Sequence, residues 1–209
     1  MKRTGILGGT FNPIHTGHLI LAEQARSEYS LDEVLIIPSG ISYFKKGTDI
    51  PDGKIRLKMC ELAVKDNPGF TVSDIEIKRE GNTYTADTIR ELREKTPDDR
   101  LFFITGADIL HEIGSWKEPK VIFDNCTLLV SVRNNESEDD LRTDMDMLKE
   151  RYGARISILH TTNIDISSSM IRKLISEKKS VRYYLPEALR EFILDNMIYD
   201  TNAKSQNDV

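Results

Sequence analysis

Residues 5–18 read Gly5-Ile6-Leu7-Gly8-Gly9-Thr10-Phe11-Asn12-Pro13-Ile14-His15-Thr16-Gly17-His18. Ile6-Leu7 predicts a first strand, and apolar residues spaced at helical intervals predict a helix over residues 16–29. Two glycines between a strand and a helix let backbone N–H groups approach an anion, and the helix N-terminus adds partial positive charge. The glycines match neither the G-x-G-x-x-G fingerprint nor the G-x-x-x-x-G-K-[ST] phosphate loop. This unit predicts the start of a ligand-binding α/β sheet.

The same alternation of strand and helix continues along the chain. Further strands are predicted at residues 34–37, 70–75, 101–104, 127–130 and 156–159. Further helices are predicted at about 52–66, 85–95, 167–176 and 186–196. The expected fold class is therefore α/β, a doubly wound, mostly parallel sheet with a small C-terminal helical part.

The domain organisation is expected to be simple. Residues 1–200 are predicted to form a single domain, with the helical part at about 165–198 and a polar tail at 201–209. The acidic, polar stretch 133–140 is interpreted as a solvated connection. No internal repeat is visible.

Composition narrows the class of protein. The 209 residues are 39% hydrophobic and 30% charged, with a net charge of −5, which argues against a general nucleic-acid binder. The apolar run near the N-terminus is too short for a signal peptide or membrane span. Cys60 and Cys126 are far apart and predict buried thiols in a reducing compartment. We expect a cytoplasmic protein without membrane or nucleic-acid partners.

In open α/β sheets, ligands bind beyond the carboxyl ends of the strands, which is where His15 and His18 lie. These residues are three apart at the entrance of the first helix and could present ring N–H groups to one phosphate chain. A metal site is the first alternative, but it needs a third ligand and the other candidates are scattered. In the other alternative, His18 satisfies a buried backbone group and His15 lies at the surface.

Three further segments offer polar groups at strand or helix ends. Ser167 is a good N-cap, and Ser168 and Arg172 share one helical face, so they could hold phosphate oxygens. The alternative is an ordinary capped helix whose arginine faces solvent. Gly106 and Asp108 follow a strand and could contact a ribose, or Asp108 could simply cap a helix. Trp116, the only tryptophan, could be a ligand contact or a packing residue.

Residues 9–18 resemble the (T/H)-x-G-H signature of the nucleotidylyltransferase superfamily, and most closely its bacterial nicotinate mononucleotide adenylyltransferase family. The resemblance covers nearly the whole chain and implies a Rossmann-like nucleotidyltransferase fold. It implies that His15 and His18 are catalytic, contacting the triphosphate and stabilising the α-phosphate in the transition state. It also makes the loop residues Gly8, Gly9, Thr10 and Phe11 contacts of ATP.

Other segments match the same family in order. Residues 166–172 resemble its I-S-S-T-x-I-R motif, which implies that Ser167, Ser168 and Arg172 hold the β- and γ-phosphates. Residues 106–116 resemble its G-A-D-x-L…W segment, which makes Gly106 and Asp108 contacts of ATP and stacks Trp116 on the pyridine ring. Tyr84-Thr85 resembles the Y-T segment, where a helix N-terminus receives the nicotinate carboxylate.

The match is weakest at residues 38–45. Lys45 stands in register with the lysine of the family's P-P-H-K motif, whereas Ser42, Tyr43 and Phe44 replace the two prolines and the histidine. Lys46 adds a second positive charge. Lys45 is therefore expected to contact the substrate, on a loop less rigid than the family's.

The resemblance implies that the phosphate of nicotinate mononucleotide attacks the α-phosphorus of ATP, releasing pyrophosphate and deamido-NAD. Mg²⁺ is expected as a cofactor that arrives with ATP, without a metal site made by the protein alone. The expected partners are thus ATP and nicotinate mononucleotide, in a protein that could be a homo-oligomer. Alternatives are a nicotinamide mononucleotide or phosphopantetheine acceptor, a CTP-dependent relative, or a module that senses nucleotides without turnover. Class I aminoacyl-tRNA synthetases share a related turn but need far more chain.

Overall fold

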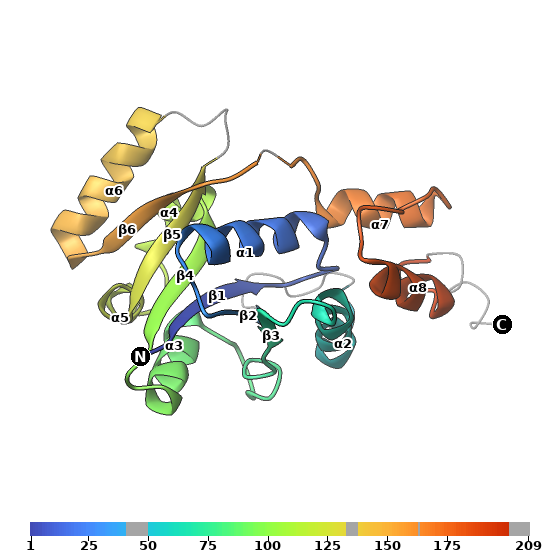
Figure 1. Ribbon diagram of the computed structural model, residues 1–209, viewed down its shortest axis with the longest axis horizontal. Coiled ribbons are helices and arrows are strands. Elements are labelled where there is room, and N and C mark those ends of the chain that lie inside the picture. The colour runs from blue at the N-terminus through green and yellow to red at the C-terminus, as the bar shows by residue number, and fades with distance from the viewer. Residues whose placement is uncertain (41–49, 133–137, 163, 201–209) are drawn as a thin grey trace.

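The computed structural model describes residues 1–40, 50–132, 138–162 and 164–200; of residues 138–140 it describes the backbone only. Within these ranges a six-stranded parallel sheet has the order β3-β2-β1-β4-β5-β6 (Figure 1). The strands are β1 (Arg3–Gly9), β2 (Glu33–Pro38), β3 (Phe70–Val72), β4 (Arg100–Gly106), β5 (Cys126–Val132) and β6 (Arg155–His160). The doubly wound α/β prediction is confirmed, and all five neighbouring strand pairs are parallel.

Two helical layers cover the sheet. One contains α1 (Thr16–Glu28), α2 (Gly53–Val64), α7 (Ser168–Ser176) and α8 (Glu187–Asp195). The other contains α3 (Thr85–Lys95), α4 (Asp108–Ile113), α5 (Pro119–Asn125) and α6 (Glu138–Tyr152). In Figure 1, α7 and α8 lie beyond the carboxyl end of β1, opposite the N-terminus. The C-terminal helices therefore reach the end of the sheet where ligands bind in this architecture.

The core follows the alternation of side chains along each strand. In β1, Leu7 packs with the α1 layer and Ile6 with the α3 layer. In β4, Phe102 and Ile104 belong to the first core and Phe103 to the second. Both faces are thus apolar, as a sheet covered on both sides requires. Cys60 and Cys126 are buried free thiols.

Three helices were not predicted from the sequence. Helices α4 and α5 are only six and seven residues long, too short to show a period. Helix α6 is longer, and its buried Leu141, Met145 and Leu148 do follow helical spacing. The interpretation of residues 133–140 as a solvated connection is wrong for Glu138–Asp140, which begin α6; residues 133–137 lie outside the described part.

The third strand is shorter than the predicted residues 70–75. It ends at Val72, after which the Ser73 hydroxyl accepts a hydrogen bond from the Ile75 N–H at 3.3 Å. A serine side chain bonding to a backbone two residues ahead favours a turn over a strand.

Of the described residues, no helix combines the length and apolar character that crossing a membrane requires. The polar tail at 201–209 lies outside the described residues.

Candidate active site

The strand order changes direction between β1 and β4, so the carboxyl ends of these strands mark the expected ligand site. Gly8 and Gly9 are the last residues of β1, and the loop up to His15 comes after them. Gly106 is the last residue of β4, and Asp108 begins the helix that follows. The two segments are adjacent because β1 and β4 pair directly. The structure thus brings together predicted residues that lie about a hundred positions apart in the sequence.

The loop after β1 is held by its carbonyl oxygens. Four carbonyls accept hydrogen bonds from three segments, the residue after β2, α2 and α7: Gly9 O from the Ser39 N–H (2.8 Å), Thr10 O from Arg56 Nη1 (2.9 Å), Asn12 O from Arg172 Nη1 (2.7 Å) and Pro13 O from Ser168 Oγ (2.8 Å). Backbone carbonyls near a polyphosphate would repel it unless they are paired. The four hydrogen bonds hold the loop in one conformation and reduce the electrostatic repulsion between its carbonyl oxygens and a polyphosphate.

Phe11 supports the loop from inside. It is buried, and its backbone has φ of 48°, an uncommon conformation for a residue with a side chain. A Cβ on Gly9 would lie 3.1 Å from the Phe11 ring, so the glycine leaves space for the ring to pack against the backbone. The ring in turn meets the His18 ring edge to face, with centroids 5.2 Å apart. Phe11 therefore shapes the site, and contact with ATP remains a prediction for it.

His15 and His18 form a stacked pair at the start of α1. Their ring centroids are 3.7 Å apart at an interplanar angle of 28°. The His15 N–H donates to His18 Nδ1 at 3.2 Å, which satisfies a backbone group as one alternative proposed. His15 is buried, however, and not at the surface as that alternative required. Because His18 Nδ1 accepts a hydrogen bond, its neutral ring carries the proton on Nε2.

Both imidazoles are neutral at neutral pH. Burial lowers the pKa of His15 from 6.5 to about 4. Desolvation, with a smaller contribution from the neighbouring His15, lowers the pKa of His18 to about 3. Bringing a second positive charge next to a stacked ring would be costly. The pair can therefore supply hydrogen-bond donors to a phosphate, and not two positive charges.

Helix α7 begins beside the same loop. Ser167 caps it by accepting a hydrogen bond from the Met170 N–H at 3.2 Å. Ser168 and Arg172 both reach back to the loop, and Arg172 Nη2 also donates to Ser169 Oγ at 3.3 Å. Arg172 does not simply face solvent, so the alternative of an ordinary capped helix does not describe it. The helix N-terminus and the opening loop are joined into one unit.

Asp108 is the first residue of α4 and not its cap, since Ala107 occupies that position. Its carboxylate folds back towards the end of β4, and a Cβ on Gly106 would lie 2.5 Å from Asp108 Oδ1. A Cβ at position 106 would displace this exposed carboxylate from its place at the strand end.

A cavity of about 620 Å³ connects the opening loop to the segments predicted to bind the acceptor. Gly8, Gly9 and Thr10 line one side, and Tyr84, Thr85 and Trp116 line the other. Trp116 is half-buried and packs edge to face on Phe103, with centroids 6.4 Å apart. The remaining described residues predicted for ATP do not line this cavity. Lys45 and the Ser42–Lys46 loop lie outside the described residues.

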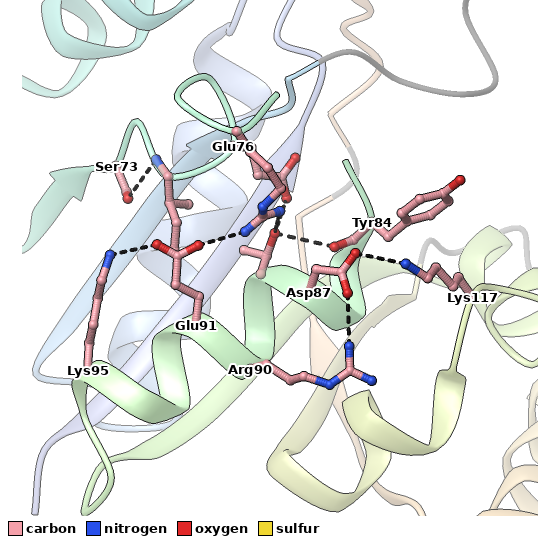
Figure 2. A network of polar contacts seen from close by, with 11 residues as sticks. Ser73, Glu76, Tyr84, Asp87, Arg90, Glu91, Lys95 and Lys117 are labelled. Atoms are coloured by element: carbon pink, nitrogen blue, oxygen red, sulfur yellow. Dashed lines mark hydrogen bonds and ion pairs between the residues drawn. The ribbon is translucent and has the colours of Figure 1, made fainter. Parts of the chain in front are cut away.

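A polar network fixes the wall that contains the start of α3 (Figure 2). Arg79 Nη1 donates to Thr88 Oγ1 at 2.9 Å, and this hydroxyl donates to Glu76 Oε1 at 2.8 Å. The other arm of Arg79 pairs with Glu91 at 2.8 Å. Glu76 and Thr88 both line the cavity. The turn after β3 is thereby tied to α3, whose N-terminus faces the cavity through Tyr84 and Thr85.

A family model described as cytidylyltransferase-like matches residues 6–174. A protein from Lachnoclostridium phytofermentans named "Probable nicotinate-nucleotide adenylyltransferase" is 41% identical over 199 residues, covering 95% of this chain and all of its own. A protein of the same name from Geobacter metallireducens is 39% identical over 94% of this chain and 98% of its own. The chain belongs to the nicotinate-nucleotide adenylyltransferases.

This adenylyltransferase also resembles a solved structure in fold. The Plasmodium falciparum nicotinic acid mononucleotide adenylyltransferase, described as complexed with NaAD, superposes with a TM-score of 0.77 at 18% identity. The match covers 97% of this chain and all of the other. It supports the Rossmann-like nucleotidyltransferase fold predicted for the chain.

Two residues of the adenylyltransferase site were missed by the sequence reasoning. Arg56 in α2 is only 4% exposed and donates to the carbonyls of Thr10 and Pro51, at 2.9 and 3.1 Å. Lys117 lines the acceptor cavity beside Trp116. An arginine within an amphipathic helix gives no signal that it is buried, whereas the position of Lys117 directly after Trp116 could have been noticed.

Proposed function

We propose that this chain transfers the AMP moiety of ATP to nicotinate mononucleotide, forming deamido-NAD and pyrophosphate. The names of its relatives at about 40% identity support this reaction. The observation that carries the proposal is the cavity joining the opening loop to Tyr84, Thr85 and Trp116. It provides a place for an acceptor whose phosphate points to the loop and whose ring lies near the tryptophan.

The reaction needs no nucleophile from the protein. An oxygen of the acceptor phosphate attacks the α-phosphorus of ATP, and the bond from that phosphorus to the pyrophosphate oxygen breaks. Catalysis then consists of alignment and of stabilising charge as it develops. His18 Nε2–H is the donor assigned to the α-phosphate, because its Nδ1 is already engaged by the His15 N–H. The buried His15 stacks behind it and fixes its ring plane.

The start of α7 is proposed to hold the β- and γ-phosphates. The Ser168 hydroxyl has one hydrogen, which it donates to Pro13 O, so its contribution is to brace the loop and to offer its backbone N–H. Ser167 caps the helix by accepting a hydrogen bond on its oxygen, which leaves its hydroxyl hydrogen free to donate. Arg172 has five N–H donors, and two of its nitrogens already bond within the protein. The groups available to phosphate are therefore the remaining donors of Arg172, the Ser167 hydroxyl and the helix N-terminus.

The ribose of ATP and the pyridine ring of the acceptor are assigned to groups whose chemistry complements them. The exposed Asp108 carboxylate, next to Gly106, can accept hydrogen bonds from ribose hydroxyls. The N-terminus of α3 at Tyr84-Thr85 favours a carboxylate over a neutral amide, since the helix dipole stabilises negative charge there. Trp116 is the flat surface on which the pyridine ring stacks.

Mg²⁺ is proposed to enter with ATP. Phosphate oxygens of ATP and water molecules would supply most of its ligands, as Mg²⁺ usually keeps several waters. Bound in this way, it would neutralise charge on the triphosphate.

The test compares three acceptors in parallel by following pyrophosphate release from ATP. Nicotinate mononucleotide should give a kcat/KM about tenfold or more above that of nicotinamide mononucleotide, which corresponds to about 1.4 kcal/mol. Phosphopantetheine should give no turnover above background. Faster turnover with the amide would overturn the assignment of the α3 N-terminus. Tight ATP binding without turnover on any acceptor would instead identify a nucleotide-sensing module.

A further inference from the structure

Four charged residues link α3 to the segment that carries Trp116. Lys117 Nζ lies 3.1 Å from Asp87 Oδ2, and Arg90 Nη1 lies 2.8 Å from Asp87 Oδ1 (Figure 2). Arg90 Nη2 also pairs with Glu118 Oε1. Because Lys117 and Glu118 are neighbours in the chain, these contacts close a ring. We call Asp87, Arg90, Lys117 and Glu118 the ion-pair ring.

The ion-pair ring joins the two segments on the acceptor side of the cavity, the start of α3 and the segment with Trp116. Lys117 follows Trp116 directly and lines the cavity itself. Its ammonium also lies 4.3 Å from the centroid of the Tyr84 ring, a cation–π contact. Asp87 stands in the first turn of α3, two residues after Thr85. One lysine therefore touches the start of α3 while being covalently attached to the tryptophan.

The ion-pair ring contributes more to the position of the segment around Trp116 than to the free energy of unfolding. Its side chains are 28–50% exposed, and ion pairs that are exposed to this degree contribute little to the free energy of unfolding. Helix α3 is also attached to α5 at the other end, where Arg93 Nη2 donates to Asn125 O at 3.0 Å. The backbone of Glu118 has φ of 48°, an uncommon conformation that needs its surroundings to hold it. The segment around Trp116 is thus the part that depends on the ring.

We propose that Lys117, held by Asp87, is a positioning residue that fixes Trp116 relative to the α3 N-terminus and thereby determines how tightly the acceptor ring binds. The inference rests on the proposed function, since it places the acceptor's pyridine ring in this cavity. Lys117 acts through Trp116 and Tyr84. It affects the acceptor and leaves the ATP side unchanged, because the ion-pair ring contacts none of the groups assigned to ATP.

The experiment uses the full chain with Lys117→Met, Lys117→Arg, Asp87→Asn and the double variant Lys117→Met/Asp87→Asn. The matched control is Lys120→Met, which removes an exposed lysine of α5 whose ammonium lies 2.7 Å from Asp124 of the same helix. Steady-state kinetics give KM for ATP and for both pyridine mononucleotides. Acrylamide quenching of tryptophan fluorescence reports on Trp116 alone, because the chain has one tryptophan.

Lys117→Met should raise KM for nicotinate mononucleotide about tenfold and increase quenching, with kcat and the KM for ATP within twofold of wild type. Asp87→Asn should raise the same KM and increase quenching equally, and the double variant should be no worse than either single variant. Lys117→Arg should keep both the KM and the quenching near those of the wild type.

Unchanged acceptor KM and quenching in Lys117→Met would overturn the proposal. So would a rise confined to the acid, with no rise for the amide, because that marks direct ionic contact with the carboxylate. Absence of turnover by the wild type would count against the proposed function and not against the ring, whose effect on quenching would still be measurable.

Discussion

The imidazole of His18 is held in one orientation by the His15 N–H on its Nδ1 and by the rings of His15 and Phe11. A donor placed in this way costs no reorganisation when charge develops on the α-phosphate. In the proposed reaction His18 therefore acts as a hydrogen-bond donor with a defined tautomer. Burial lowers the pKa of His18 to about 3, so the ring is neutral at neutral pH in the ligand-free protein.

Replacing His18 with alanine should lower kcat about 10²–10³-fold, equivalent to roughly 2.7–4 kcal/mol, the range found when one oxyanion-hole donor is removed. Stopped assays of pyrophosphate release measure the loss. Circular dichroism and the thermal midpoint check that the variant folds. An unfolded His18→Ala protein would instead make the histidine a structural residue, and an unchanged kcat would remove it from the mechanism.

Stability should fall as the pH drops below neutral because of the same pair. Folding lowers the pKa of both histidines from 6.5, so between pH 6.5 and about 4 the unfolded chain binds protons that the folded chain excludes. The free energy of unfolding therefore decreases as pH falls through this window and is fully retained above 6.5. From pH 7.5 to pH 5 the wild type should lose roughly 2–4 kcal/mol more than His15→Gln/His18→Gln in urea titrations. Equal losses in the two proteins would contradict the depressed pKa values.

Among the helices, α7 is the one on which the proposed reaction depends most directly, because it docks on the opening loop. Arg172→Met removes the donor to Asn12 O and a proposed phosphate ligand together. Hydrogen bonds to charged groups contribute about 1.5–3 kcal/mol, so kcat/KM for ATP should fall roughly 10- to 100-fold.

Lys173→Met is the matched control for this variant, since Lys173 is an exposed neighbour whose ammonium lies 3.9 Å from Glu177. It should behave like the wild type in the same assay. Equal activity of the two variants would show that α7 needs only its backbone at the site.

The elements that the sequence predicted well are those with a strong local signal. Residues 16–29 and 85–95 correspond closely to α1 and α3, and the buried strand runs correspond to β2, β4, β5 and β6. Helices α4 and α5 were missed because one or two turns carry no period. Helix α6 was missed because its acidic start hid the spacing of Leu141, Met145 and Leu148.

The site divides in the same way. His15, His18 and Trp116 could be predicted as site residues because their residue types and positions match a known pattern, and their roles stay predictions. The carbonyl contacts of Arg56 and Ser168 could not be predicted, since they join segments tens to more than a hundred residues apart. Ser168 illustrates the consequence: its position suggested a phosphate ligand, while its hydroxyl hydrogen is used on Pro13 O.

Across the whole molecule, the proposed reaction depends on the two halves of the sheet meeting at the switch between β1 and β4. The β1 half supplies the opening loop, and the α3–α5 region supplies Tyr84, Thr85 and Trp116. Helix α7 returns from the C-terminal end to hold the same loop. The proposed placement of an acceptor phosphate beside the donors of the loop therefore requires all three regions together.

The transfer itself is tested most directly with nicotinate mononucleotide carrying ¹⁸O in its phosphate. If that phosphate attacks the α-phosphorus of ATP, mass spectrometry should find all of the label in the dinucleotide, including its bridging oxygen, and none in pyrophosphate. Label in pyrophosphate, or no labelled dinucleotide while ATP is consumed, would contradict the account.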